Sequence, residues 1–175
     1  MRHATRSLAL LPALLLSAAC SDTSGTTGRV QLQDDCDPAT FNAALGAGNC
    51  THASSSTGVT LANFNAELQA TQKVSAWRMV PATMSVREGA TLDVVNLGGE
   101  THSYTEVENF GGGRVPALNQ ASGNTTVAPE CMDQATFEAS VVPSGQTKRH
   151  TFDETGTEKY QCCVHPWMRQ TVMVR

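Results

Sequence analysis

Residues 160–168 read YQCCVHPWM, and this stretch decides both the chemistry and the fold expected of the chain. Cys162, His165 and Met168 follow one another at a strict C-x2-H-x2-M spacing. A thiolate, an imidazole and a thioether therefore lie in one short loop. Because soft sulfur ligands combined with imidazole select copper over calcium or magnesium, the loop predicts a transition-metal site.

One histidine of a complete copper site is missing from this loop, and His102 is the candidate to supply it. It lies 60 residues upstream of Cys162, inside the segment NLGGETHS at residues 96–103, just past a β-rich stretch. In a sandwich of two sheets, a strand far away in sequence can lie beside the last loop. His52 and His150 have no matching context and are expected at the surface. Two histidines and a cysteine in a plane with a weak axial methionine form the ligand set of blue-copper electron-transfer sites. The predicted ligands are His102, Cys162, His165 and Met168.

Each predicted ligand has an ordinary structural alternative. Cys162 could instead form a disulfide, with Cys163 as the ligand, but only Cys162 fits both the spacing and the aromatic Tyr160 two positions earlier. A disulfide between the two adjacent cysteines would be strained and would remove the site. Their adjacency also argues against a binuclear copper centre, which needs two cysteines spaced to bridge both metals. The remaining alternatives are a surface position for His165, a strand position for His102 and a core position for Met168.

From residue 74 onward, short β-rich segments are separated by turn residues, as a β-sandwich requires. Strands are expected at residues 76–80, 83–87, 91–96, 102–107, 137–142, 147–152, 159–163 and 171–175. Residues 108–133 contain three consecutive glycines and two prolines. They form either a long excursion between strands or a functional loop, and their composition does not say which.

Residues 36–73 differ from the rest, because they lack the apolar residues for a core of their own. We therefore treat them as an N-terminal extension of the larger domain at residues 74–175. Within the extension, Leu61, Phe64 and Leu68 recur at i, i+3 and i+7 after Thr60, a possible N-cap. This spacing predicts a short amphipathic helix.

Taken together, residues 74–175 resemble the cupredoxins, the type 1 copper proteins that include plastocyanins, amicyanins and azurins. The resemblance is carried by MVP at residues 79–81 followed by Val86 and Gly89, by Asn96 six residues ahead of His102, and by residues 160–168. The C-x2-H-x2-M spacing with proline directly after histidine looks most like amicyanin. The resemblance implies an all-β, Greek-key β-sandwich, here with an N-terminal extension containing a short helix. It also implies one copper ion cycling between Cu(I) and Cu(II), and a surface edge of His165 through which the electron passes.

The first residues indicate export. Residues 1–19 place Arg2 and Arg6 ahead of an apolar stretch and then small residues, as in a secretory signal peptide. The apolar stretch falls short of the roughly 20 residues that cross a bilayer. The LSAAC ending resembles a bacterial lipobox, which would make Cys20 the lipidated first residue of a flexible tether at residues 20–35. We expect a lipoprotein on the periplasmic face of the bacterial cell envelope, with a soluble periplasmic or secreted chain as the alternative.

The remaining cysteines indicate two disulfides. With Cys20 assigned to lipid, five cysteines remain, and an odd number points to one sulfur with another role. If that sulfur belongs to Cys162, the other four can pair. Cys36 with Cys50 is the obvious local pair, and Cys131 with Cys163 would be the long-range pair. Four cysteines allow three connectivities, and the sequence does not choose among them.

Charge and motifs exclude several functions. Lys+Arg number 12 against Asp+Glu 16 with no basic run, which argues against nucleic acid as a partner. Removal of residues 1–19 deletes two arginines, so the formal net charge of the mature chain is 10 minus 16, or −6. This negative charge is a weak hint of basic partners. No motif supports an enzyme. We expect a monomer that transfers single electrons and docks weakly and transiently with redox partner proteins. The alternative is a periplasmic copper-handling protein without electron cycling.

Overall fold

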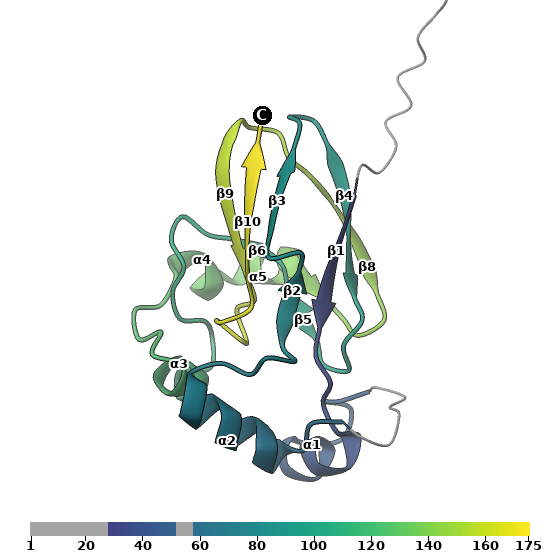
Figure 1. The fold of residues 1–175 in the computed structure, drawn as a ribbon, viewed down its shortest axis with the longest axis vertical. Coiled ribbons are helices and arrows are strands. Elements are labelled where there is room, and N and C mark those ends of the chain that lie inside the picture. Colours follow the sequence, from purple (N-terminus) through teal and green to yellow (C-terminus); the bar gives the residue numbers. More distant parts are fainter. Residues whose placement is uncertain (1–27, 52–57) are drawn as a thin grey trace, which may run out of the picture.

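The computed structural model describes residues 28–51 and 58–175. Two four-stranded sheets enclose one core (Figure 1). The first sheet has the order β2 (Arg78–Val80), β1 (Gly28–Gln33), β4 (Thr91–Asn96) and β8 (Thr147–Thr151). The second has the order β3 (Thr83–Val86), β10 (Arg169–Val174), β9 (Gly156–Gln161) and β6 (Thr105–Glu106). A short β5 (His102–Ser103) pairs with β7 (Val141–Val142). The predicted β-sandwich is confirmed.

Strand alternation explains how the sandwich closes. In β1, Val30 and Leu32 are fully buried, and in β10 Val172 and Val174 point into the same core cluster. Because successive side chains in a strand point to opposite faces, each strand contributes an apolar inner face and a more polar outer face. Tyr160 on β9 joins this core two residues before the ligand loop. The loop that follows β9 is thus attached to a buried end of that strand.

The first strand corrects the prediction of a tether at residues 20–35. Residues 28–33 form β1, which lies in the interior of its sheet, antiparallel to β2 and parallel to β4, with Val30 opposite Val94. Its sequence, GRVQLQ, does alternate apolar and polar residues, and this was the signal available for a strand. Residues 1–27 lie outside the described residues, so the signal peptide and Cys20 stay predictions.

Two helices precede the rest of the sandwich. The predicted helix is confirmed as α2 (Leu61–Thr71), where the Thr60 hydroxyl accepts a hydrogen bond from the Asn63 amide at 3.2 Å. The helix α1 (Pro38–Leu45) was not predicted, although Asp37 and Pro38 are a typical helix start. Figure 1 shows both helices across the end of the sandwich opposite the C-terminus. None of the helices in the described part of the chain has the length and apolarity to cross a bilayer.

Helices also occupy the predicted excursion and part of a predicted strand, so the protein is not strictly all-β. Residues 108–133 contain α3 (Pro116–Ala121) and α4 (Pro129–Met132). The strand predicted at residues 137–142 is wrong for its first four residues, which belong to α5 (Gln134–Ser140). The side chain of Asp133 accepts a hydrogen bond from the Thr136 amide at 2.8 Å and caps this helix.

Both disulfides suggested by the cysteine count are present. Cys36 bonds to Cys50 across α1, and Cys131 at α4 bonds to Cys163 in the last loop. Cys162 is the one free cysteine among the described residues, and it is buried. The structure therefore selects one of the three connectivities and excludes a bond between the two adjacent cysteines.

Candidate metal centre

The predicted ligand loop is the turn of a β-hairpin. Cys162 follows β9 directly, Met168 precedes β10 directly, and the two strands pair antiparallel with Gln161 opposite Arg169. Across the turn, the Cys162 amide donates to the Met168 carbonyl at 3.0 Å, and the Met168 amide donates to the His165 carbonyl at 2.9 Å. The C-x2-H-x2-M spacing is therefore the length of this hairpin turn.

Three donor atoms converge at the base of the loop. Cys162 Sγ lies 3.8 Å from Nδ1 of His102 and 3.9 Å from Nδ1 of His165. These three donor atoms all lie within 4.8 Å of one another, and none of the three side chains is more than 3% exposed. Met168 is fully buried in the same core cluster as Cys162. One soft thiolate with two imidazoles fits copper by ligand type, and together with Met168 these residues form the copper-binding site.

The surroundings of Cys162 favour its thiolate form. Burial raises the pKa of the thiol, but hydrogen bonds and charge from His102 and His165 outweigh burial and hold the pKa well below its ordinary value. The Ser103 amide also points at Sγ, at 3.5 Å. The thiolate is the form of cysteine that ligates a metal, so the site is prepared for one.

His102 is held by a buried carboxylate that the sequence analysis missed. Its Nε2 donates to Asp34 Oδ2 at 2.8 Å, which leaves Nδ1 free to face Cys162. Burial raises the pKa of Asp34, but the hydrogen bond and charge of His102 and the hydrogen bonds of two backbone amides outweigh burial and lower the pKa to about 2. Burial lowers the pKa of His102, whereas Asp34 and Cys162 raise it, to about 9. Asp34 follows β1, within the predicted tether, where no sequence signal marked it.

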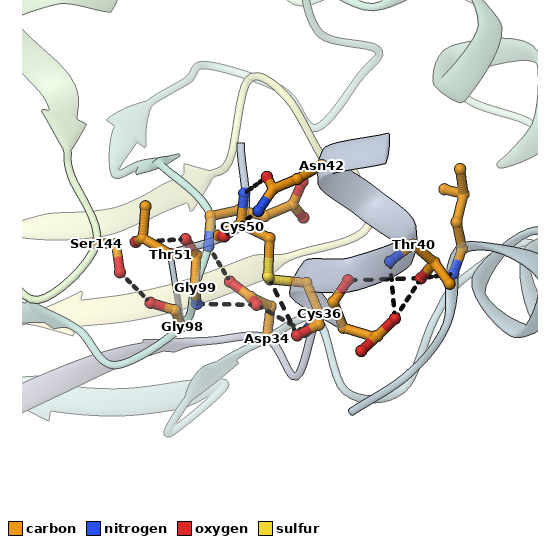
Figure 2. The surroundings of a disulfide bond; sticks show 12 residues. Asp34, Cys36, Thr40, Asn42, Cys50, Thr51, Gly98, Gly99 and Ser144 are labelled. Carbon is orange, nitrogen blue, oxygen red and sulfur yellow. Dashed lines mark hydrogen bonds between the residues drawn. A yellow bond between two sulfur atoms is a disulfide. The ribbon is translucent and has the colours of Figure 1, made fainter. Parts of the chain in front are cut away.

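The disulfide between Cys36 and Cys50 braces this carboxylate (Figure 2). Asp34 Oδ1 accepts hydrogen bonds from the amides of Cys36 at 3.1 Å and Gly99 at 3.0 Å, and Oδ2 accepts one from the Glu100 amide at 3.0 Å. A Cβ on Gly98 would lie 1.9 Å from Oδ2, so only glycine leaves room for the carboxylate. Asp34 is therefore a fully hydrogen-bonded buried charge.

His165 has a carboxylate of its own, which the sequence analysis also missed. Its Nε2 lies 3.4 Å from Oε2 of Glu100, and Nε1 of Trp77 donates to the same oxygen at 2.7 Å. Burial raises the pKa of Glu100 above its ordinary value, although His165 and Trp77 act in the opposite direction. Each imidazole of the site thus has Nδ1 toward Cys162 and Nε2 toward a carboxylate, an arrangement that orients metal-ligating histidines.

The expected surface edge of His165 is absent, and this is a correction. His165 is only 3% exposed. Its ring lies 6.4 Å from that of Phe64, 6.2 Å from Trp77 and 5.5 Å from Trp167, measured between ring centroids. Phe41 of α1 stacks on Trp77 at 5.8 Å. The N-terminal extension therefore packs on the metal site and covers the imidazole, because its aromatic residues find no other core to enter.

We expect the extension to contribute strongly to stability through Phe64. Replacing Phe64 by alanine should lower the free energy of unfolding by about 3–5 kcal/mol, because a large buried aromatic side chain is removed. Leu45→Ala in α1 is the control, since Leu45 is 53% exposed and should change stability by less than about 0.5 kcal/mol. Urea denaturation of both variants measures the difference. Equal, small losses would mean that the helices do not pack against the site.

The remaining histidines lie elsewhere. His150 was expected at the surface but is half-buried, with Nε2 at 2.7 Å from the Tyr160 hydroxyl, and burial lowers its pKa. It stacks edge-on against Tyr104, Phe152 and Tyr160 in the sandwich. His52 lies outside the described residues. His150 does not belong to the cluster around Cys162.

The chain matches one protein family, and it is similar to several solved structures. Residues 66–175 match the family described as copper binding proteins, plastocyanin/azurin family. Among solved structures, a purple cupredoxin from Nitrosopumilus maritimus is 18% identical, with 58% of this chain and 86% of that chain covered and a TM-score of 0.37. Amicyanin from Paracoccus versutus is 17% identical, with 59% and 77% covered and a TM-score of 0.38. A comparison with curated proteins gives no match.

Proposed function

The chain belongs to the plastocyanin/azurin family of copper-binding proteins, and from this premise we propose that it carries single electrons in the bacterial cell envelope. The observation that carries the proposal is the buried convergence of Cys162 Sγ with Nδ1 of His102 and His165, beside a buried Met168. Copper held there supplies a one-electron change between Cu(I) and Cu(II). The family consists of electron carriers, and the protein is not an enzyme.

The residues of this chain hold the ligands in place before the metal binds. The hairpin positions Cys162 and Met168 through backbone hydrogen bonds, and Pro166 restricts the backbone next to His165. Asp34 and Glu100 orient the two imidazoles by contacting Nε2, the ring nitrogen that does not face Cys162. A carrier needs ligands that move little when its charge changes, and a site built in this way on a β-scaffold meets that requirement.

Location in the envelope is part of the proposal. The lipobox-like ending at Cys20 supports a lipid anchor on the periplasmic face, with a soluble exported chain as the alternative. The two disulfides fit an oxidising compartment outside the cytosol. Membrane attachment would then be through Cys20 alone.

Copper titration of the mature chain, made without Cys20, tests the proposal. We expect one equivalent of Cu(II) to produce an intense blue absorption band and an EPR spectrum with small copper hyperfine splitting, and repeated reduction and oxidation to restore both. A colourless protein that binds Cu(I) tightly would instead support copper handling without electron cycling. Absence of copper binding would overturn the ligand assignment itself.

A further inference from the structure

The covered position of His165 raises the question of how electrons reach the site. Phe64 of the N-terminal extension and Trp77, just after it, pack on the imidazole, and Glu100 covers Nε2. Trp167 differs from these neighbours, because it is half-buried and belongs to the ligand loop. Its ring lies 5.5 Å from the ring of His165, and it precedes Met168 directly in the chain. An aromatic side chain thus leads from the buried imidazole toward the surface.

The surface beside Trp167 is hollowed and positively charged. A cavity of about 260 Å³ is lined by Trp167, by Lys73 after α2, by Arg78 on β2 and by Arg169 on β10. Lys73 and Arg78 lie five positions apart, whereas Arg169 lies about 90 positions further along the chain, so the fold brings two distant segments together here. We call these four residues the Trp167 surface.

The cations of the Trp167 surface are not neutralised within the described part of the chain. Arg78 donates to the Ser75 carbonyl at 3.1 Å, and Arg169 donates to the Pro166 carbonyl at 2.8 Å and to the side chain of Asn124. No carboxylate of the described residues lies within ion-pair distance of either guanidinium or of Lys73. Glu67 of α2 is engaged by the backbone instead, because it accepts a hydrogen bond from the Ser75 amide at 2.8 Å.

Carboxylates gather on a different part of the molecule. Glu106, Glu108, Glu130 and Glu158 line a hollow at β6, α4 and β9 with a single cation, Lys159. Burial and then the neighbouring carboxylates, Glu158 first among them, raise the pKa of Glu106. The chain as a whole carries a formal charge of −4, so the positive Trp167 surface stands out against an acidic background.

We infer that the Trp167 surface is the docking site of a redox protein that presents carboxylates, and that the electron passes through Trp167 and His165. The inference rests on the proposed electron-transfer function and adds to it the kind of partner, a protein with carboxylates at its docking surface. Opposite charges steer the encounter, while the carboxylates around Glu106 repel the same partner and so orient it. One electron crosses per encounter, so that the copper site is oxidised as the one-electron centre of the partner is reduced, or the reverse.

Charge reversal at Arg78 tests the docking surface. Arg78 is exposed on β2, and Arg87 is equally an exposed arginine but follows β3, at the end of the sandwich opposite the ligand loop (Figure 1). In the copper-loaded chain at low ionic strength, Arg78→Glu should slow oxidation by hexacyanoferrate(III) about fivefold more than Arg87→Glu does. The same variant should speed oxidation by the cationic tris(phenanthroline)cobalt(III), and both effects should shrink as salt screens them. Equal effects of the two variants would overturn the inference.

A binding map separates this inference from the proposed function. Hexacyanochromate(III), a paramagnetic trianion that is not reduced under these conditions, should broaden backbone amide signals at residues 73–79 and 167–169 and leave residues 87–90 sharp. The map is recorded for the Cu(I)-loaded and the metal-free chain. Broadening centred elsewhere would overturn the docking surface even if the copper site is blue. Failure to bind copper would overturn the proposed function, and the metal-free map would still decide where an anion docks.

Discussion

Replacing Cys162 by serine should abolish the intense visible band of the copper-loaded protein, whereas replacing Cys131 and Cys163 together by serine should preserve it. The reason is that Cys162 Sγ faces both imidazoles, at 3.8 and 3.9 Å, while the sulfur of Cys163 is bonded to Cys131. A serine hydroxyl is a hard ligand that lacks the soft sulfur donor copper prefers in such sites. Absorption and EPR spectra of the two variants at one equivalent of copper provide the measurement.

In the metal-free protein, the double variant of Cys131 and Cys163 should lose more stability than Cys162→Ser, the reverse of their effects on colour. Cys131 and Cys163 are separated by 32 positions, and loss of their disulfide should cost roughly 4 kcal/mol on the chain-entropy account. Cys162→Ser should cost about 1 kcal/mol, as an ordinary single substitution does. Each variant is thus the control of the other. A blue Cys162→Ser protein, or a colourless Cys131→Ser/Cys163→Ser protein that is still folded, would contradict the assignment of the ligand.

Replacing Asp34 by asparagine should destabilise the metal-free protein at neutral pH. The pKa of Asp34 is lowered from 3.8 to about 2, and such a depressed carboxyl contributes stability above its unfolded pKa. The shift corresponds to about 2–3 kcal/mol. In the wild type this contribution is lost as pH falls from about 4 toward 2. The partner contribution of His102, whose pKa is raised from 6.5 to about 9, is present below pH 6.5 and lost as pH rises through 9.

Urea denaturation across this pH range tests the prediction, with Asp35→Asn as the matched control. Asp35 is the next residue, and its substitution removes the same charge without touching the hydrogen bond to His102. Only Asp34→Asn should flatten the pH dependence of unfolding below pH 4. If both variants behave alike, the buried pair between Asp34 and His102 does not contribute as described.

The same substitution should raise the reduction potential of the copper-loaded protein. Removal of a negative charge behind His102 favours the reduced, less positive metal. A tenfold change in the equilibrium, about 59 mV for one electron, is the expected size. Voltammetry at neutral pH compares Asp34→Asn with Asp35→Asn, and an unchanged potential in the first variant would show that Asp34 only positions the ring.

The ligand loop and most strands could be predicted from the sequence because their determinants are local. Cys162, His165 and Met168 lie within one hairpin turn, so their spacing alone reports that they can converge. Alternating apolar residues mark β4 and β10 because side chains in a strand point to opposite faces. Thr60 marks the start of α2, because its hydroxyl caps the helix by accepting a hydrogen bond from the amide of Asn63, three residues along the chain.

Other features depend on contacts that no local pattern contains. Asp34 reaches His102 across 68 positions, and Trp77 reaches Glu100 across 23. Glu100 lies two residues before His102, but the spacing that marked His102 gives it no role, and Asp34 lies in a stretch predicted to be a tether. The helix α5 takes up the first four residues of the strand predicted at 137–142, and the Asp133 cap is a local helix signal that the strand pattern concealed.

The sequence by itself determined the metal chemistry, since ligand identity and hairpin spacing are properties of a few neighbouring residues. Only the tertiary structure decided which residues cover the metal ligands and which charged residues lie near them. The aromatic residues of the N-terminal extension, too few for a core of their own, bury themselves against His165 and remove its expected surface edge. Burial is a property of the whole packed molecule. Distant segments must come together before one ligand is covered and before positive charges gather beside Trp167.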